Sequence, residues 1–162
     1  MALNSIVISD STTLISLINI ERFELLFKFS ETIIISPAVY KEVTVQKVAK
    51  RTLDEYISLL KVTISEPKNK KKIQELLIRL DIGESESIVL AEEQNLPLII
   101  DEKRGKKIAL SFGLETIGLI GILLIYKKKA YLSESEIIII VEELREVNFR
   151  VSDGLLALLL EA

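Results

Sequence analysis

Short apolar runs rich in β-branched residues constrain the fold of this chain more than any other feature. They lie at residues 3–9, 32–35 and 98–100, and a shorter run lies at 62–64. Such runs are typical of strands in a parallel sheet that helices cover on both faces. Segments with helical spacing of apolar residues separate them, and this alternation predicts an α/β fold.

The segments between the predicted strands are expected to form helices. Ser36-Pro37 places an N-cap and a proline where one helix should begin, and Gly83 is expected to break the chain between two others. No linker rich in Gly, Pro or Ser divides the chain, so we predict a single domain over residues 1–162. The expected helices cover residues 11–18, 22–29, 37 to beyond 43, 53–60, the turn at 67–72 through 80, 84–94, 103–112, 116–128, 134–146 and 155–160.

The composition limits the chemistry that this chain can perform. It has no cysteine and no histidine, so thiolate catalysis, zinc–thiolate sites and imidazole bases are excluded. Catalysis must come from carboxylates, hydroxyls, Lys or Arg, and any metal site must be lined by oxygen. The net charge of −3 means that nucleic-acid binding requires a local basic patch.

No segment of the sequence predicts membrane insertion. The longest apolar stretch, residues 117–126, is too short to cross a bilayer. The first residues lack the cationic region of a signal peptide. We therefore expect a cytoplasmic protein with no membrane partner.

Two of the predicted strands end directly at an aspartate. Asp10 follows the first strand and Asp101 follows the run at 98–100. Ligands of open parallel sheets bind at the carboxyl ends of the strands, which favours a ligand site at these acids. A single aspartate there is more often a helix N-cap, but two on separate strands support the ligand site as well as the cap.

Further acids lie on the predicted helices. Glu42 is close to the apolar positions of its helix, so its side chain could border the core. The simpler alternative is that this side chain is solvated. Glu84 and Glu86 follow Gly83 and are two residues apart, so on a helix they diverge by about 200° and at most one faces a shared site. Clustered carboxylates suit Mg²⁺ or Mn²⁺, and such a site suits phosphodiester hydrolysis.

These residues resemble the PIN domain, and more closely the small prokaryotic proteins related to VapC toxins. The pattern LDxGExExIxLA is similar to residues 80–91, and LxIDExxGKxxA to residues 98–109. Residues 116–130 approximate a later glycine-containing pattern, with Ala130 where a glycine is common. Residues 149–160 match FRVSxxLxxxLL, so the resemblance covers essentially the whole chain.

The resemblance implies a three-layer α/β/α PIN-like fold with a central, mostly parallel sheet. It also implies an Mg²⁺- or Mn²⁺-dependent endoribonuclease, the toxin of a toxin–antitoxin pair, with RNA as substrate, a cognate antitoxin as partner and a homodimer as assembly. By the same resemblance the small hydroxyl position after the first acid falls on Ser11 or Thr12. The catalytic, metal-binding carboxylates that it implies are Asp10, Glu42, Glu86 and Asp101, with Glu84 and Glu102 as second-rank candidates.

Basic residues follow Asp101 directly. Lys103 and Arg104 are candidates to contact RNA phosphates, although a solvated helix face explains them equally well. Two other functions remain open at this point. One is a PIN-like nucleic-acid or partner-binding protein with little or no nuclease activity, and the other is a phosphatase or phosphotransferase with Asp10 as nucleophile.

Overall fold

The computed structural model describes residues 2–161, and its centre is a five-stranded sheet in which all strands are parallel. The strands lie in the order β3-β2-β1-β4-β5, so the direction of chain progression reverses between β1 and β4. This reversal is the topological switch point, where open parallel sheets bind ligands. The strands are β1 (Asn4–Ser9), β2 (Ser30–Ile35), β3 (Val62–Ile64), β4 (Leu98–Ile99) and β5 (Thr116–Ile117).

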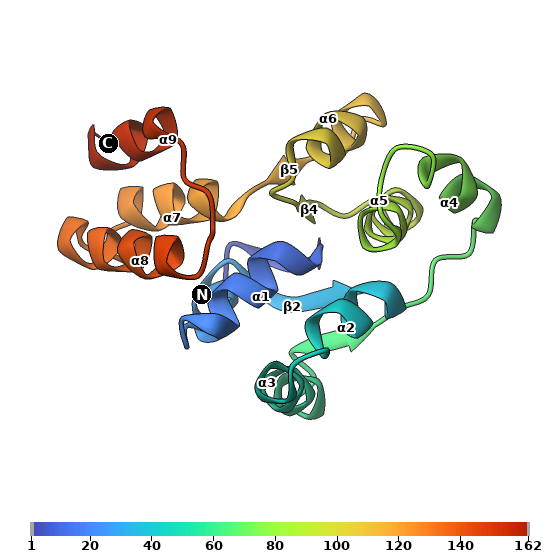
Figure 1. Ribbon diagram of the computed structural model, residues 1–162, viewed down its shortest axis with the longest axis horizontal. Helices are drawn as coiled ribbons and strands as arrows, with labels where there is room; N and C mark the ends of the chain where they lie inside the picture. Colours follow the sequence, from blue (N-terminus) through green and yellow to red (C-terminus); the bar gives the residue numbers. More distant parts are fainter. Residues whose placement is uncertain (1, 162) are drawn as a thin grey trace.

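Helices surround the sheet on both faces (Figure 1). Among residues 2–161, no helix is both long enough and apolar enough to span a bilayer. The helices are α1 (Ser11–Asn19), the 3₁₀-helix η1 (Phe23–Lys28), α2 (Pro37–Val43), α3 (Lys47–Ser58), α4 (Lys70–Leu76), α5 (Ile82–Gln94), α6 (Lys103–Ser111), α7 (Leu119–Lys128), α8 (Glu134–Glu146) and α9 (Asp153–Glu161).

Alternate residues of the strands feed two separate cores. Val7, Ile33 and Ile99 pack with α1, η1, α2, α3, α7 and α8 on one face. Ile8 and Leu98 pack with α4, α5 and α6 on the other face. The period of two along a strand puts successive side chains on opposite faces, and burial on both faces explains why the strands are apolar runs. The predicted three-layer α/β/α, single-domain fold is therefore confirmed.

The predicted helix over residues 116–128 is wrong at its start. Thr116 and Ile117 form β5, and α7 begins only after Gly118. The backbone N–H of Leu98 donates to the carbonyl of Glu115 at 2.9 Å, and that of Ile100 donates to Ile117 at 3.0 Å. Pairing with β4 therefore decides the conformation of a segment whose own sequence favours a helix.

The prediction that Gly83 breaks the chain between two helices is also wrong, because Gly83 lies inside the first turn of α5. That helix begins at a capping box, in which the Asp81 side chain accepts from the N–H of Glu84 and the Glu84 side chain accepts from the N–H of Asp81. The interruption falls before Asp81 instead, since α4 ends at Leu76.

Three more helices differ from the sequence-based expectation, one in its type and two in their boundaries. Residues 22–29 contain the 3₁₀-helix η1 rather than an α-helix, α2 ends at Val43, and the helix expected at 53–60 begins earlier, as α3 at Lys47.

The five apolar residues Ile137–Val141 do not all face the core. Helix α8 buries Ile137, Ile140 and Val141 and leaves Ile138 and Ile139 partly exposed.

Candidate active site

Asp10 lies at the switch point of the sheet, directly after β1. Its backbone N–H donates to the carbonyl of Ile99 in β4 at 2.9 Å, which fixes its height at the edge of the sheet. The residue is 3% exposed, and its Oδ1 has no hydrogen-bond partner within residues 2–161. The pKa of Asp10 is raised to about 7, first by burial and then by the charges of Glu84, Asp81 and Glu42, against a hydrogen bond from the Ser11 backbone that lowers it.

A buried carboxylate oxygen without a partner is costly, because it has lost water and has gained no donor and no positive charge in exchange. Asp10 is the N-cap residue of α1, as the alternative interpretation expects, but its side chain makes no capping hydrogen bond to the helix. Its Oδ1 is therefore not used for capping, and within residues 2–161 it has no other partner.

Glu42 reaches this region from α2. Its Oε2 accepts a hydrogen bond of 2.6 Å from the hydroxyl of Ser11, the residue that follows Asp10. Burial raises the pKa of Glu42, and the hydrogen bond from Ser11 lowers it in part. The charges of Asp81 and Glu86 raise it as well. A Cβ at residue 83 would overlap Oε1 of Glu42, so Gly83 gives this side chain its place.

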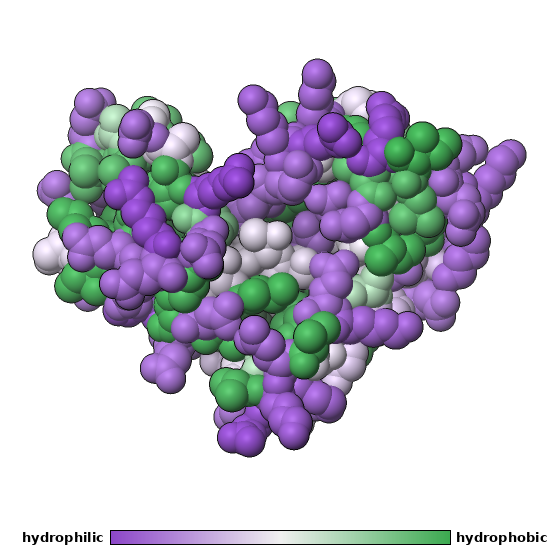
Figure 2. All heavy atoms as spheres, in the orientation of Figure 1, coloured by the Kyte–Doolittle hydropathy of each residue, from purple (hydrophilic) through white to green (hydrophobic). Residues whose placement is uncertain are grey.

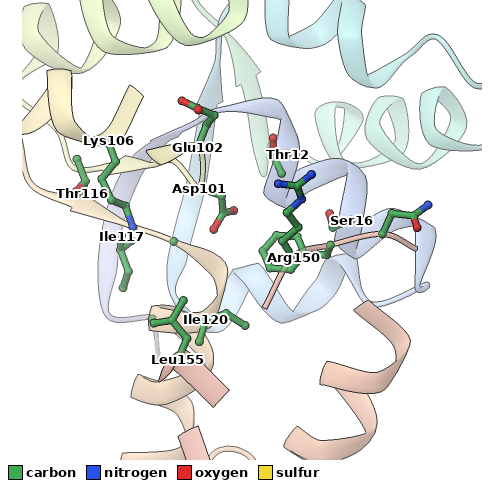
Figure 3. Close-up of a pocket in the computed structure, with 14 residues that line it drawn as sticks. Thr12, Ser16, Asp101, Glu102, Lys106, Thr116, Ile117, Ile120, Arg150 and Leu155 are labelled. Atoms are coloured by element: carbon green, nitrogen blue, oxygen red, sulfur yellow. The ribbon is translucent and has the colours of Figure 1, made fainter. Parts of the chain in front are cut away.

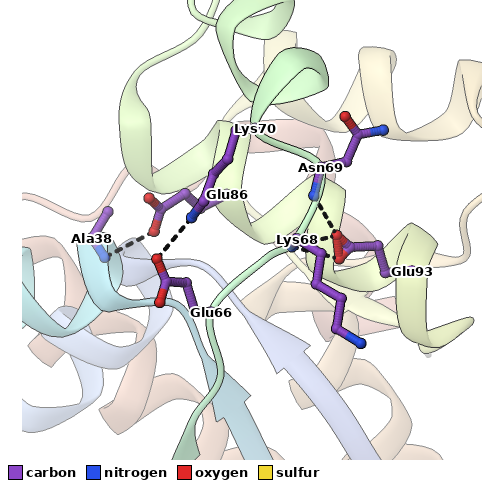
Figure 4. Close-up of polar contacts among 7 residues, drawn as sticks. All are labelled: Ala38, Glu66, Lys68, Asn69, Lys70, Glu86 and Glu93. Atoms are coloured by element: carbon purple, nitrogen blue, oxygen red, sulfur yellow. Dashed lines mark hydrogen bonds and ion pairs between the residues drawn. The ribbon is translucent and has the colours of Figure 1, made fainter.

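Glu84 and Glu86 point to different neighbours, as their two-residue spacing predicts. Glu84 is 7% exposed, and burial, followed by the charge of Asp81, raises its pKa to about 7. Glu86 instead accepts a hydrogen bond of 3.0 Å from the backbone N–H of Ala38, at the start of α2 (Figure 4). Glu84 is thus the one of the two whose charge acts on Asp10, whereas the charge of Glu86 acts on Glu42.

Asp101 follows β4, but its side chain turns toward α7. It accepts hydrogen bonds from the Thr13 hydroxyl and, at 2.9 Å, from the backbone N–H of Leu119. Burial raises the pKa of Asp101, while these two bonds and the nearby Lys106 ammonium act in the opposite direction. A Cβ at Gly118 would lie 2.6 Å from Oδ1 of Asp101, so a glycine is needed for this approach.

Glu102 has a separate task at the start of α6. Its Oε2 accepts a hydrogen bond of 2.8 Å from the N–H of Gly105, and it therefore caps the helix. The side chain is exposed. Its charge nevertheless contributes to the raised pKa of Glu84, so Glu102 borders the acidic group around Asp10.

The structure brings together three acids whose charges act on Asp10, namely Glu84, Asp81 and Glu42. Glu86 and Glu102 border this group, since their charges act on Glu42 and Glu84. Glu86 and Asp101 accept hydrogen bonds from α2, α1 and α7, and within residues 2–161 no three acids already converge as ligands of one metal ion. Asp81 was missed by the sequence analysis, although an acid three residues before Glu84 is the signal of a capping box. The unpaired Oδ1 of Asp10 and the uncompensated charges around it suit a divalent cation, which prefers such oxygen ligands.

The predicted substrate-binding residues lie on two sides of Glu102. The Ser11 hydroxyl is occupied by Glu42, whereas Thr12 is exposed and lines a cavity beside Asp101. Lys103 and Arg104 are exposed and line a second hollow, together with Arg79, Lys107 and Glu102.

An all-parallel sheet with a buried aspartate and further acids at its switch point defines an α/β domain with an oxygen-lined acidic site. A family model described as "DUF3368: PIN domain" matches residues 6–162, and the chain belongs to this family. PIN domains are in general nucleases that use divalent metals.

One solved structure of similar fold is a PilT N-terminus domain protein, SSO1118, from the hyperthermophilic archaeon Sulfolobus solfataricus P2. It is 18% identical to this chain, and the match covers 72% of this chain and 89% of the other, with a TM-score of 0.47. No curated protein matches the chain.

Proposed function

We propose that this protein is a divalent-metal-dependent endoribonuclease. The observation that carries the proposal is the buried Asp10 carboxyl at the switch point, with an oxygen that has no partner and three further acids nearby. The membership of the PIN family supports the same class of reaction.

The proposed metal ligands are Asp10, Glu42 and Glu84. Asp10 would hold Mg²⁺ or Mn²⁺, with Glu42 and Glu84 completing the site after they leave Ser11 and Asp81. Such a cation lowers the pKa of water and stabilises negative charge on a phosphodiester oxygen. Asp101 orients the backbone at the start of α7 through its hydrogen bond from Leu119. Glu86 does the same at the start of α2 through its hydrogen bond from Ala38.

The reaction adds one water molecule across a P–O bond. A new bond forms between the water oxygen and phosphorus, the bond to the departing sugar oxygen breaks, and that oxygen takes up a proton. The exposed Lys103 and Arg104, with Arg79 and Lys107 around the same hollow, supply positive charge for phosphates on one side of the hydrolysed bond.

The test is cleavage of a pool of structured and single-stranded RNAs by the purified protein with Mg²⁺ or Mn²⁺, compared with EDTA. Asp10→Asn is the critical variant, and Asp153→Asn, at an exposed aspartate of α9, is its matched control. We expect cleavage that requires the metal, is lost in Asp10→Asn and is retained in Asp153→Asn. Full metal-dependent cleavage by Asp10→Asn would refute the proposal.

One observation favours a second function, a PIN-like binding protein with little or no nuclease activity. Apart from Asp10, each predicted carboxylate already accepts a hydrogen bond from the protein: Glu42 from Ser11, Glu84 from Asp81, Glu86 from Ala38 and Asp101 from Thr13 and Leu119. Thermal melting with Mn²⁺ separates the two functions, since a cation that binds the folded state raises the melting temperature. No shift at millimolar Mn²⁺ would favour the binding protein.

The toxin role, the cognate antitoxin and the homodimer remain parts of this proposal that rest on the resemblance to VapC-related proteins. Toxicity of the expressed chain, suppressed in Asp10→Asn, tests the first of them. Copurification and sedimentation of the full chain test the other two.

A further inference from the structure

Helices α5 and α8 both begin at a capping box, and the two boxes differ in charge. In each box the N-cap side chain accepts a hydrogen bond from the third helical residue, a glutamate whose side chain accepts one from the N-cap backbone. In α8 the pair is Ser133 and Glu136, joined at 3.2 and 2.7 Å. In α5 the pair is Asp81 and Glu84, joined at 2.8 and 3.2 Å. The α5 box therefore holds two carboxylates where the α8 box holds one.

The glutamates of the two boxes also have different surroundings. Glu136 is exposed, and the hydrogen bonds from Ser133 lower its pKa, as expected of a carboxylate that caps a helix. Glu84 is buried, and its bond from the Asp81 backbone does not offset burial and the Asp81 charge, so its pKa is raised. A nearby cation therefore stabilises Glu84 much more than it would stabilise Glu136.

The structure of α5 does not depend on its capping box alone. The helix is held by packing, since Ile88, Val89 and Leu90 are buried. The turn that precedes it, residues 77–81, is more loosely held, because Leu80 is buried but Ile78 is 84% exposed. An apolar patch lies over this part of the surface, around α4, α5 and the turn between them (Figure 2). Opening of the box would therefore release the turn and leave the helix in place.

The turn joins the acidic site to the basic hollow. At one end, the charge of Asp81 acts on Asp10. Two residues earlier, Arg79 lines the hollow, and its carbonyl accepts a hydrogen bond of 3.4 Å from the Arg104 side chain. A displacement of the turn thus changes the hollow as well.

Glu102 provides a second link between the same two regions. It lines the basic hollow, and its charge acts on Glu84. Its carboxylate points away from that of its neighbour Asp101 (Figure 3). Glu102 therefore belongs electrostatically to the side of the site where Glu84 lies.

We infer that Glu84 alternates between two partners, the backbone N–H of Asp81 and the cation held by Asp10, and that this exchange moves the turn at residues 77–81 together with the basic hollow. The inference rests on the proposed function and adds a conformational coupling to it. Because coupling between two sites is reciprocal, an anion bound in the hollow also changes the affinity of the acidic site for the cation.

The first experiment follows both capping boxes by NMR in the ¹⁵N-labelled full-length protein while Mg²⁺ is added. We expect the Asp81 amide to shift and to exchange with water about two- to tenfold faster, the factor for one lost hydrogen bond. The Ser133 amide, in the α8 box, should not change. Saturation with Mg²⁺ is established by thermal melting. An Asp81 amide that is unchanged at saturation would overturn the inference.

The second experiment places a fluorescent reporter on the turn. The chain has no tryptophan, so Ile78→Trp introduces a single emitter at an exposed position, and Leu158→Trp, at an exposed position of α9, is its matched control. Mg²⁺ should change the emission of Ile78→Trp with the midpoint found for the Asp81 amide, and it should leave Leu158→Trp unchanged. Adding Asp10→Asn should abolish the response. Emission that does not respond, or that responds equally with Asp10→Asn, contradicts the inference.

Circular dichroism melts show whether each variant is folded, and if Ile78→Trp is not, the Asp81 amide decides the result alone. The outcomes separate this inference from the nuclease. Binding of Mg²⁺ with the α5 box intact refutes only the coupling. Release of the box by Mg²⁺ without any RNA cleavage refutes only the nuclease, and a site that does not bind Mg²⁺ refutes both.

Discussion

Replacing Asp10 by asparagine should stabilise the metal-free protein above neutral pH. Burial raises the pKa of this carboxyl from 3.8 to about 7, and such a shift corresponds to roughly 4 kcal/mol between the folded and unfolded states. Asparagine has nearly the same shape and no charge, so it removes this penalty. Part of the gain is offset, because the new amide must find partners beside Glu84 and Glu42.

The pH dependence has a defined sign. Between the unfolded and folded pKa values the folded state binds more protons, so the free energy of unfolding falls as the pH rises from about 4 to about 7. The penalty is complete above that window and absent below it. We therefore expect the free energy of unfolding of Asp10→Asn to be about 2–4 kcal/mol higher than that of the wild type near pH 8. The difference should shrink toward pH 4.

Denaturant unfolding in EDTA at several pH values measures this difference, with Asp153→Asn as the control for a change at an exposed aspartate. A gain of this size raises the melting temperature by about 4–16 °C for a chain of this length. Added Mn²⁺ should stabilise the wild type and not the variant. A variant less stable than the wild type at every pH would refute the claim that Asp10 is desolvated and uncompensated.

Three further predictions concern the surroundings of the site and the core. The melting temperature of the wild type in EDTA should fall as the pH rises from about 4 to about 7, because the raised pKa values of Asp10 and Glu84 act with the same sign. Gly83→Ala should reduce cleavage at least tenfold, since its Cβ displaces Glu42; Gly154→Ala, with open space around it, should keep full activity and gain up to about 1 kcal/mol of stability. Tyr126→Phe should cost about 1–3 kcal/mol in denaturant unfolding, because the buried carbonyl of Leu25 loses the hydroxyl that donates to it; a melt equal to that of the wild type would refute this.

The sheet could be predicted from the sequence because the segments around three of its strands carry their own signal. The runs at β1, β2 and β4 are apolar at successive positions, as burial on both faces requires. The two-residue strand β5 carries no such signal. Its conformation depends on backbone hydrogen bonds to β4, which lies some eighteen residues earlier in the chain.

The positions of Asp10 and Asp101 at the strand ends could likewise be predicted, but the directions of their side chains could not. Asp101 turns toward α7 because Thr13 and Leu119 donate to it, and Thr13 is 88 residues away in the chain. The sequence shows neither that approach nor the role of Gly118 in permitting it. Hydrogen-bond donors that are distant in the sequence therefore decide whether the side chain of an acid at the end of a strand faces a shared site.

Which of Glu84 and Glu86 turns toward Asp10 follows from the sequence once the start of α5 is known. Asp81 caps the helix, so Glu84 occupies its third position and turns back toward Asp81 and Asp10, while Glu86 turns to α2. Glu84→Gln retains an oxygen for the capping box and removes the charge, and it should lower the pKa of Asp10 and weaken stabilisation by Mn²⁺. Glu86→Gln keeps an oxygen for the N–H of Ala38 and should leave the pKa of Asp10 unchanged, because Glu86 is not among the charges that raise it. Titration of the Asp10 carboxyl by NMR in both variants measures this, and a larger change in Glu86→Gln would show that Glu86 is the neighbour of Asp10 in solution.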